Sequence, residues 1–376
     1  MASTPLEAFA YCVRGERVPD AVLDALAAEA EGEEGTRALF GELIEPLSDS
    51  FDPRLAEAYL DTFARLLERV APELQADALL RRHRALGRPT EKPRRVVVLS
   101  RVTLGADVAV VSPFLAAAAA AYPDAELLFA GNLKNYELFE ERAGHLPLRY
   151  GRTALLRERV AVGLELAGRL DRPGTLVIDA DSRLSQLGLL PFGPPERYLF
   201  FPSRAYRPES AEPIAALACA FVKETLGCDV RPFIAPVETK WVPPTDVTIS
   251  LGVGENPAKR VGGDFERRLV QGLLDRGHSV LLDKGGGGEE TARVEELEQS
   301  CRGPLYTWQG PFAPFAEAIR ASRLYIGYDS AGQHVAAACG VRQITVFAGA
   351  PNGKFVERWR PWAPAERAAL VQASAL

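Results

Sequence analysis

Short apolar runs without polar alternation constrain this chain more than any other feature. The run "VVVLS" at residues 96–100 is rich in β-branched side chains, and its apolar residues do not alternate with polar ones. Such a run is typical of a strand that is buried on both faces of a parallel sheet. The stretch "VSPFLAAAAAAYPDA" then has a helical pattern, and "ELLFAG" at residues 126–131 is the next strand. Strand, helix and strand in this order predict a βαβ unit and an α/β fold.

Two such series follow a helical segment. In residues 1–90 apolar side chains recur at spacings of three and four, and "GRPTEKPRR" has the composition of a linker. The first series continues with strands at 175–181 and 197–201, and a proline-rich stretch at 232–244 ends it. The second series predicts strands at 247–252, 278–283, 323–329 and 342–349, and helices at 263–277, 293–301, 314–322 and 331–340. We expect an all-helical N-terminal domain (1–92) and two Rossmann-like domains (93–240 and 241–376) that face a cleft.

Charge and cysteine content exclude several classes of protein. The 376 residues carry a formal net charge of -6 with scattered Arg and Glu, so nucleic acid is not an expected partner. The N-terminus does not resemble a signal peptide. The most apolar run, 108–122, is interrupted by Ser112 and Pro113 and is shorter than the roughly 20 residues of a membrane helix. Five dispersed cysteines form no CxxC pair. We therefore expect a soluble cytoplasmic protein without a metal site or a disulfide framework.

The segment "YIGYDSAGQHVAAACG" lies at the end of a predicted strand, where α/β proteins bind ligands. Asp329 leaves the strand, and Ser330, Ala331 and Gly332 form the turn into a helix. Unsatisfied backbone N–H groups at that helix start could bind a diphosphate, with a hydrogen bond from His334. Alternatively, Asp329 or Ser330 caps the helix. A Ser-His-Asp triad is disfavoured because no G-x-S-x-G motif is present.

The same segment resembles the D-[ST]-G-x-x-H-x-A-A-A-x-G-x-P-x-[IV]-x-[LV]-F-G segment of glycosyltransferase family 9, the heptosyltransferases. The matching positions are Asp329, Ser330, His334, Ala336, Ala337, Ala338 and Gly340. The resemblance covers about residues 94–360 and leaves out the helical segment. It implies a GT-B fold, with the acceptor bound by the first Rossmann-like domain and the donor by the second.

In that family the first strand is followed by a Gly-Asp pair whose aspartate is the catalytic base. The resemblance therefore implies that Asp107 is the base, with Thr103 and Gly105 on the acceptor side. Here Ala106 is inserted between Gly105 and Asp107, which could turn the carboxylate away from the substrate. Alternatively, Asp107 caps the following helix.

The family's K-R-W-P-x-x-x-F segment is matched at Lys259, Arg260 and Phe265. The resemblance implies that these cations stabilise the charge on the departing diphosphate. They could equally be solvated surface charges. Glycines near this segment complete the expected donor site, or form flexible turns: Gly252, Gly285 and Gly286.

Asp179 and Asp181 form a D-x-D pattern, by which the other main glycosyltransferase fold, GT-A, holds a divalent metal. Because a second Rossmann-like series is present, we interpret the two carboxylates as acceptor-side residues that line the cleft.

These interpretations predict an inverting, metal-independent glycosyltransferase that uses a nucleotide-diphosphate sugar as substrate, needs no cofactor and acts in bacterial cell-surface glycan or glycoprotein synthesis. The acceptor is a glycan, a glycolipid or a protein. Two alternatives stay open: a nucleotide-sugar-binding scaffold without turnover, and a GT-B 2-epimerase. The helical segment could pack on the catalytic domains, mediate homo-oligomerisation or recruit a partner, and a peripheral membrane contact is left open.

Overall fold

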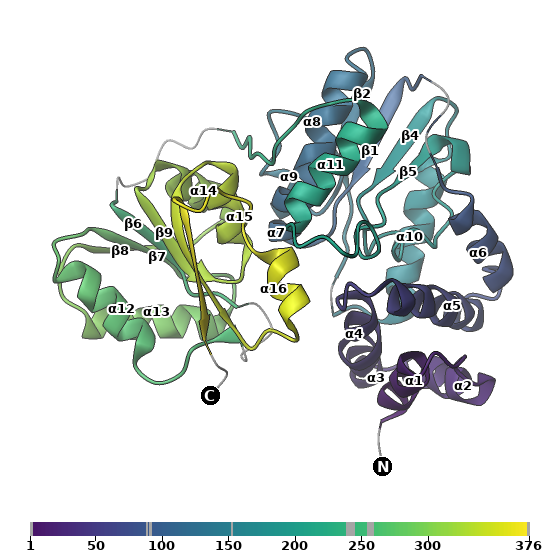
Figure 1. Cartoon of the computed structure of the whole chain (residues 1–376), viewed down its shortest axis with the longest axis horizontal. Coiled ribbons are helices and arrows are strands. Elements are labelled where there is room, and N and C mark those ends of the chain that lie inside the picture. The colour runs from purple at the N-terminus through teal and green to yellow at the C-terminus, as the bar shows by residue number, and fades with distance from the viewer. Residues whose placement is uncertain are drawn as a thin grey trace.

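The computed structural model describes residues 3–87, 89, 92–151, 153–237, 245–253 and 259–373. It consists of a helical segment followed by two α/β domains, each built on a parallel sheet (Figure 1). The expected boundary at 240/241 lies outside the described residues, as does part of the proline-rich stretch.

The helical segment contains amphipathic helices in the order expected from the spacing of its apolar residues. Its elements are α1 (Thr4–Val13), α2 (Asp20–Glu29), α3 (Glu33–Ala38), η1 (Leu39–Ile44), α4 (Glu45–Ser48), α5 (Pro53–Val70) and α6 (Ala76–Arg84). The element η1 is a π-helical stretch between α3 and α4. Ser3 and Asp52 cap α1 and α5 through their side chains, which satisfies helix N–H groups that would otherwise lack a partner.

The first α/β domain has the strand order β3-β2-β1-β4-β5, and every pair is parallel. Its elements are β1 (Arg95–Leu99), α7 (Leu104–Ala106), η2 (Asp107–Val111), α8 (Ser112–Ala121), β2 (Glu126–Gly131), α9 (Leu133–Tyr136), β3 (Gly144–Pro147), α10 (Leu156–Leu170), β4 (Thr175–Asp179), η3 (Pro195–Arg197), β5 (Tyr198–Phe200) and α11 (Ile214–Leu226). The expected strand at 175–181 ends two residues early, because residues 180–188 turn away from the sheet.

The second domain has the order β11-β10-β9-β6-β7-β8, again all parallel. Its elements are β6 (Val247–Ser250), α12 (Phe265–Leu274), β7 (Val280–Asp283), α13 (Gly288–Ser300), β8 (Leu305–Trp308), α14 (Phe312–Ala321), β9 (Leu324–Tyr328), α15 (Ala331–Ala338), β10 (Arg342–Ala348), α16 (Gly353–Trp359) and β11 (Ala368–Ala373). Both orders place the first strand of the domain at the centre of its sheet, as in doubly wound folds.

The two faces of the first sheet belong to different hydrophobic clusters. Val97 and Leu99 of β1 pack in one cluster with the helical segment, including Phe63 and Leu67 of α5. Val96 and Val98 pack on the opposite face with α8 and α11. This face of the first sheet therefore belongs to one hydrophobic cluster to which the N-terminal helices, α10 and the 184–192 loop all contribute.

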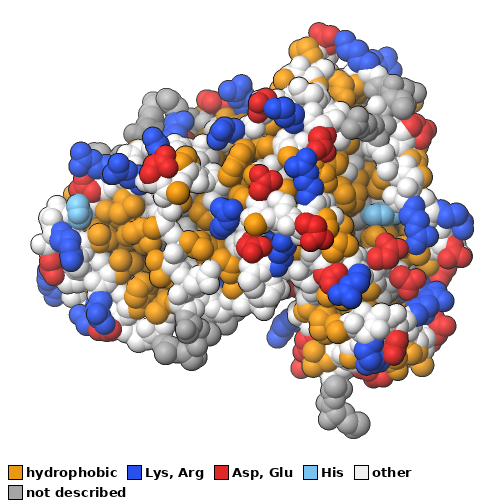
Figure 2. Space-filling model, viewed as in Figure 1, with side chains coloured by type: hydrophobic (Ala, Val, Ile, Leu, Met, Phe, Trp, Pro, Cys, Tyr) orange, Lys and Arg blue, Asp and Glu red, His pale blue; other side chains and the backbone are white. Residues whose placement is uncertain are grey.

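The cluster on the other face continues into the second domain, where it includes Phe315, Tyr325 and Val335. The continuous helix Leu104–Ala121 is long and apolar enough to span a membrane, but it is 67% buried within the protein, between β1 and α15. Its apolar character is accounted for by this interior position. Figure 2 shows Lys, Arg, Asp and Glu side chains scattered over one face of the molecule, with an indentation between the second domain and the helical segment.

Helix α16 of the second domain lies against the first domain, between the two lobes in Figure 1. The Arg358 side chain is 1% exposed and donates hydrogen bonds to the carbonyl oxygens of Arg207, Pro208 and Glu212. Lys354 Nζ donates to the carbonyl of Ser210 at 2.8 Å. These bonds fix the second domain to the 207–212 loop of the first.

Candidate functional site

The turn between β9 and α15 combines a helix N-terminus with a cation. Asp329 Oδ2 accepts a hydrogen bond from Lys259 Nζ at 2.7 Å, and Asp329 Oδ1 accepts one from Gln333 Nε2 at 2.6 Å. Ser330 occupies the N-cap position without a capping hydrogen bond, and its hydroxyl oxygen is buried without a partner in the described structure. The alternative that Asp329 or Ser330 caps this helix is therefore not realised, and Ser330 and Ala331 stay partly exposed. The first turn of α15 keeps N–H groups that can bind an anion.

Two of the residues expected beside this turn have other neighbours. A Cβ atom on Gly332 would lie 2.1 Å from the Tyr325 hydroxyl, so glycine is needed there for packing within the domain. His334 is 5% exposed and lines a small cavity between the domains with Ala109 and Arg231. Burial lowers the pKa of His334 to about 4, so its imidazole is neutral at physiological pH. It therefore packs at the domain interface.

The other expected donor residues lie along the carboxyl ends of β6 and β7. Arg260 pairs with Glu289, and its Nε atom is buried without a hydrogen bond in the described part of the chain. The Glu290 carboxylate packs against two of the predicted glycines: a Cβ would meet it at 2.9 Å on Gly252 and at 2.1 Å on Gly285. Gly285 has φ +66°, a conformation that side chains disfavour. No heavy atom of the described structure lies within 4 Å of a Cβ built on Gly286.

Asp107 does not face the cleft, which corrects the expectation for a catalytic base. Its side chain is 0% exposed and lies inside the continuous helix Leu104–Ala121. Its carboxylate accepts hydrogen bonds from Ser100 Oγ (2.6 Å), the Arg101 backbone N–H (2.6 Å) and Asn135 Nδ2 (2.6 Å). Burial raises the pKa of Asp107 to about 6, against the opposing effect of these hydrogen bonds. Asp107 does not cap a helix; through Ser100 and the Arg101 N–H it holds the 100–103 loop in place.

Asp179 is also turned inward, unlike Asp181. Asp179 is 0% exposed and accepts hydrogen bonds from the Ser182 backbone N–H (2.7 Å) and from the side chains of Ser185 and Tyr198. It closes the loop after β4, so its expected place in the cleft is wrong. The described residues contain no group of three or more His, Cys, Asp or Glu side chains that could hold a metal ion.

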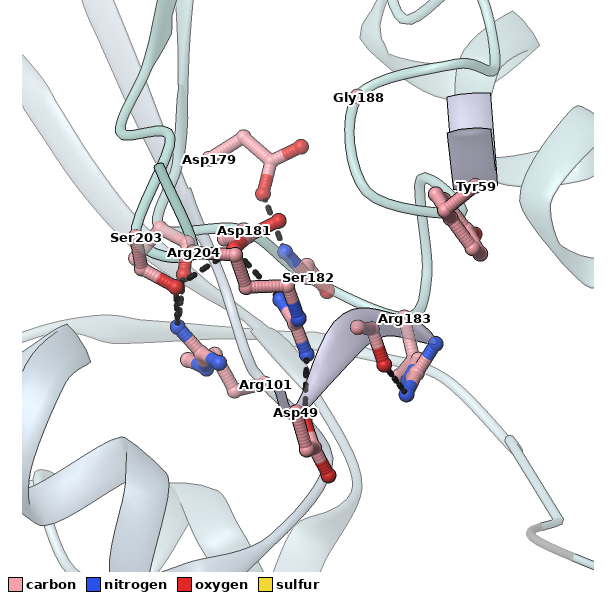
Figure 3. A network of polar contacts seen from close by, with 12 residues as sticks. Asp49, Tyr59, Arg101, Asp179, Asp181, Ser182, Arg183, Gly188, Ser203 and Arg204 are labelled. Carbon is pink, nitrogen blue, oxygen red and sulfur yellow. Dashed lines mark hydrogen bonds and ion pairs between the residues drawn. The ribbon is translucent and has the colours of Figure 1, made fainter. Parts of the chain in front are cut away.

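Asp181, by contrast, lines a pocket of about 150 Å³ together with Thr103. Two of the four expected acceptor-side residues therefore share one cavity. Its walls come from the helical segment (Asp49), the first domain (Arg101, Arg183, Arg204) and the second domain (Trp359). Burial alone would raise the pKa of Asp181, but Arg204 and Arg101 outweigh this effect and lower it. The Asp181 carboxylate accepts hydrogen bonds from Ser203 and Arg204 (Figure 3).

Helix α7 joins this pocket to the α15 turn. Thr103 and Ala106 line the pocket, whereas a Cβ on Gly105 would lie 3.1 Å from the Ala331 Cα atom. Gly105, expected on the acceptor side, thus packs directly on α15. Trp359 also lies between the pocket and α15. Its ring is 5.8 Å from the guanidinium of Arg101, on the pocket, and 6.0 Å from the ring of His334, on α15. The anion-binding turn and the pocket are next to each other across one short helix.

Three of the four arginines on the pocket were missed in the sequence although they share a pattern. Each follows a serine within four residues of the end of a parallel strand: Ser100-Arg101 after β1, Ser182-Arg183 after β4 and Ser203-Arg204 after β5. These three strands are neighbours in the sheet, and their carboxyl ends therefore meet at one edge.

Two facing doubly wound domains with a joining C-terminal helix make up the GT-B class of glycosyltransferase folds. Within that class the chain resembles glycosyltransferase family 9: the family model for "Glycosyltransferase family 9 (heptosyltransferase)" matches residues 254–375. Lipopolysaccharide heptosyltransferase 3 of Escherichia coli is 36% identical over 97 residues, which cover 25% of this chain and 27% of that protein. The match thus spans about a quarter of this relative's length.

Solved structures are similar over about three quarters of the chain. A family 9 glycosyltransferase from Veillonella parvula has a TM-score of 0.55 at 18% identity and covers 77% of this chain and 89% of its own. The ADP-heptose lipopolysaccharide heptosyltransferase II of E. coli has a TM-score of 0.52 at 16% identity, with 74% and 90% covered. At these identities the likeness shows the shared fold.

Proposed function

We propose that the protein is an inverting, metal-independent glycosyltransferase that takes a nucleotide-diphosphate sugar. The observation that carries this proposal is the uncapped N-terminus of α15, with Lys259 beside it, next to an acceptor-sized pocket across α7. The donor diphosphate would bind at the α15 turn with Lys259 and Arg260, where the helix N–H groups and the two cations favour negative charge.

In the transfer step an acceptor hydroxyl oxygen bonds to the anomeric carbon as the bond from that carbon to the diphosphate oxygen breaks. The nucleoside diphosphate leaves with the electron pair, and a carboxylate takes the hydroxyl proton. Asp107 does not line the pocket, so we place this base among the carboxylates that do, with Asp181 the first candidate. The two arginines that lower the pKa of Asp181 keep its carboxylate ionised at neutral pH, although they also make it a weaker base.

The first donor to test is ADP-heptose, because a similar structure is that of an E. coli heptosyltransferase with ADP-2-deoxy-2-fluoro heptose. The experiment incubates the full chain with a panel of nucleotide sugars in EDTA, with phosphorylated and carboxylated sugars as acceptors, and measures nucleoside diphosphate release. We expect release that persists in EDTA and that falls at least about a hundredfold in Asp181→Asn. Release that requires added metal would contradict the metal-independent part.

A second candidate is a nucleotide-sugar-binding module without turnover. It is favoured by the burial of Asp107, the residue expected to be the base from the family resemblance. Tight ADP binding without diphosphate release from any donor would establish it. The protein, in either case, is expected in the cytoplasm, where nucleotide sugars are made.

A further inference from the structure

The pocket beside α7 contains more cationic groups than the carboxylates around it neutralise. Arg204 pairs with Asp181, and its Nη2 atom lies 3.5 Å from Asp49. Neither Arg101 nor Arg183 forms an ion pair with a carboxylate in the described part of the chain. The pocket lining thus carries four arginines, Arg159 included, against the three carboxylates Glu45, Asp49 and Asp181, and a buried charge that is not balanced is costly.

Arg101 is the more buried of the two. The residue is 6% exposed. Its Nη1 atom donates hydrogen bonds to the Ala180 carbonyl (2.8 Å) and to Ser203 Oγ (2.9 Å). Burial lowers the pKa of Arg101 to about 10, so the group stays charged at neutral pH while its charge is poorly solvated. An anion in the pocket would remove this cost.

Other donors on the pocket are also incompletely used. Arg183 Nη1 and the Tyr150 hydroxyl are buried and make no hydrogen bond in the described structure. Buried polar atoms are almost always paired in folded proteins. Donors without partners around a cavity indicate a ligand that accepts hydrogen bonds.

The helical segment orients these arginines. Ser48 Oγ accepts a hydrogen bond from Arg183 Nη2 at 2.9 Å, and Asp49 holds Arg204 (Figure 3). Ser48 ends α4 and Asp49 is its C-cap, and α4 follows the π-helical stretch η1, a rare feature that is frequent at functional sites. The wall that the helical segment supplies lies outside the part of the chain that matches family 9 in sequence.

Two of the six described non-glycine residues with positive φ line the same pocket. Val102 has φ +76° and Asp181 has φ +68°, and both residues line the cavity. A β-branched residue with positive φ is a rare outlier, and such strain persists mainly where a ligand site requires it. The Asp107 carboxylate, which binds the Arg101 N–H, keeps the strained loop in this conformation.

We propose that this pocket binds a compact anionic group of the sugar acceptor, a phosphate ester or a sugar carboxylate, through Arg101 and Arg183. This inference rests on the proposed function for its assignment to the acceptor, and the helical segment is then part of acceptor recognition. The three Ser-Arg pairs explain the arrangement: each serine helps to fix a loop end, and the arginine beside it faces the pocket. Arg204, which is already paired, supports the site.

The test measures binding by calorimetry with the full chain in saturating ADP, which occupies the nucleotide site. The probes are inorganic phosphate, glucuronate and neutral glucose. We expect saturable binding of at least one anionic probe and none of glucose; preference for phosphate or for glucuronate identifies the acceptor as a phosphate ester or a sugar acid. Arg183→Gln and Arg101→Gln should each weaken that binding at least about tenfold. The control Arg323→Gln removes an arginine whose side chain is 86% exposed on the second domain, and should bind like the wild type.

Absence of binding for both anions, or wild-type affinity in a folded Arg183→Gln, would overturn the proposal. Arg183 is only partly buried, so this variant keeps the test valid if Arg101→Gln fails to fold. Because no nucleotide sugar is used, the result is separate from turnover: failure to bind anions leaves sugar transfer intact as a proposal, and failure to transfer sugar leaves anion binding measurable.

Discussion

Gly105 lies against His334 so closely that a Cβ atom on Gly105 would stand 3.0 Å from the imidazole Cδ2 atom. The contact joins α7 of the first domain to α15 of the second. Since α7 also borders the proposed acceptor pocket, the two proposed substrate sites are held in register by a contact that a larger residue at position 105 would crowd.

Gly105→Ala should loosen this contact. The added methyl group would push His334 and Ala331 away, and we expect a loss of about 1 to 3 kcal/mol in the free energy of unfolding, measured by urea denaturation. The matched control is Gly168→Ala in helix α10, where a Cβ meets nothing within 4 Å. There alanine should be neutral or stabilise by about 0.5 to 1 kcal/mol. Equal effects of the two substitutions would contradict the close packing of α7 on α15.

Lys259→Ala should weaken nucleoside diphosphate binding. Removing Nζ deletes the cation beside the α15 N-terminus and leaves Asp329 without its ion-pair partner, which would repel the anion. We expect ADP to bind about ten- to a hundredfold less tightly, or about 1.4 to 3 kcal/mol, as measured by calorimetry. Lys223→Ala, which breaks an exposed ion pair with Asp229 far from α15 in the sequence, should leave the affinity unchanged. An unchanged ADP affinity in Lys259→Ala would show that the diphosphate does not bind at this turn.

Asp107→Asn should change how stability depends on pH. The folded protein holds the Asp107 proton more tightly than the unfolded chain, because its pKa rises from 3.8 to about 6 on folding. The stability that this carboxyl contributes is therefore present below pH 4 and is lost as the pH rises through 6. Asparagine resembles the protonated form, so the variant should gain on the wild type by up to about 3 kcal/mol between pH 4 and pH 7. A constant difference in unfolding free energy over that range would show that Asp107 does not titrate in it.

Arg358→Met should detach α16 from the first domain. The substitution leaves three carbonyl oxygens of the 207–212 loop without their buried donor, and we expect a loss of about 2 to 5 kcal/mol in unfolding free energy. Faster amide hydrogen exchange at residues 353–359 would locate the effect. Arg276→Met, at an exposed arginine that bonds only within its own domain in the described structure, should stay within about 0.5 kcal/mol of the wild type. Unchanged exchange in α16 would mean that other contacts hold the helix.

The parallel strands could be predicted because burial on both faces leaves continuous apolar runs such as residues 96–100. Helices α10 and α11 were not foreseen, and neither were the edge strands β3, β8 and β11. Edge strands are short and partly exposed, so their pattern is weak: β11 has no buried residue. The turn at Asp329 and Ser330 was foreseen because its chemistry is local in the sequence.

The pocket could not be foreseen in the same way. Arg101, Arg183 and Arg204 are far apart in the chain and meet only because β1, β4 and β5 are neighbours in the sheet. The position of Asp107 depended on side chains that its own segment does not contain, such as Asn135. The family motif identified Asp107 as a candidate, but tertiary contacts determine that its side chain faces inward.

The N-terminal helices share one hydrophobic cluster with α10, the 184–192 loop and the β1 residues Val97 and Leu99. Removing residues 1–87 would expose the apolar side chains of that cluster that pack on the helices, and would remove one wall of the proposed acceptor pocket. We expect a protein truncated in this way to aggregate, so assays of the two α/β domains require the full chain.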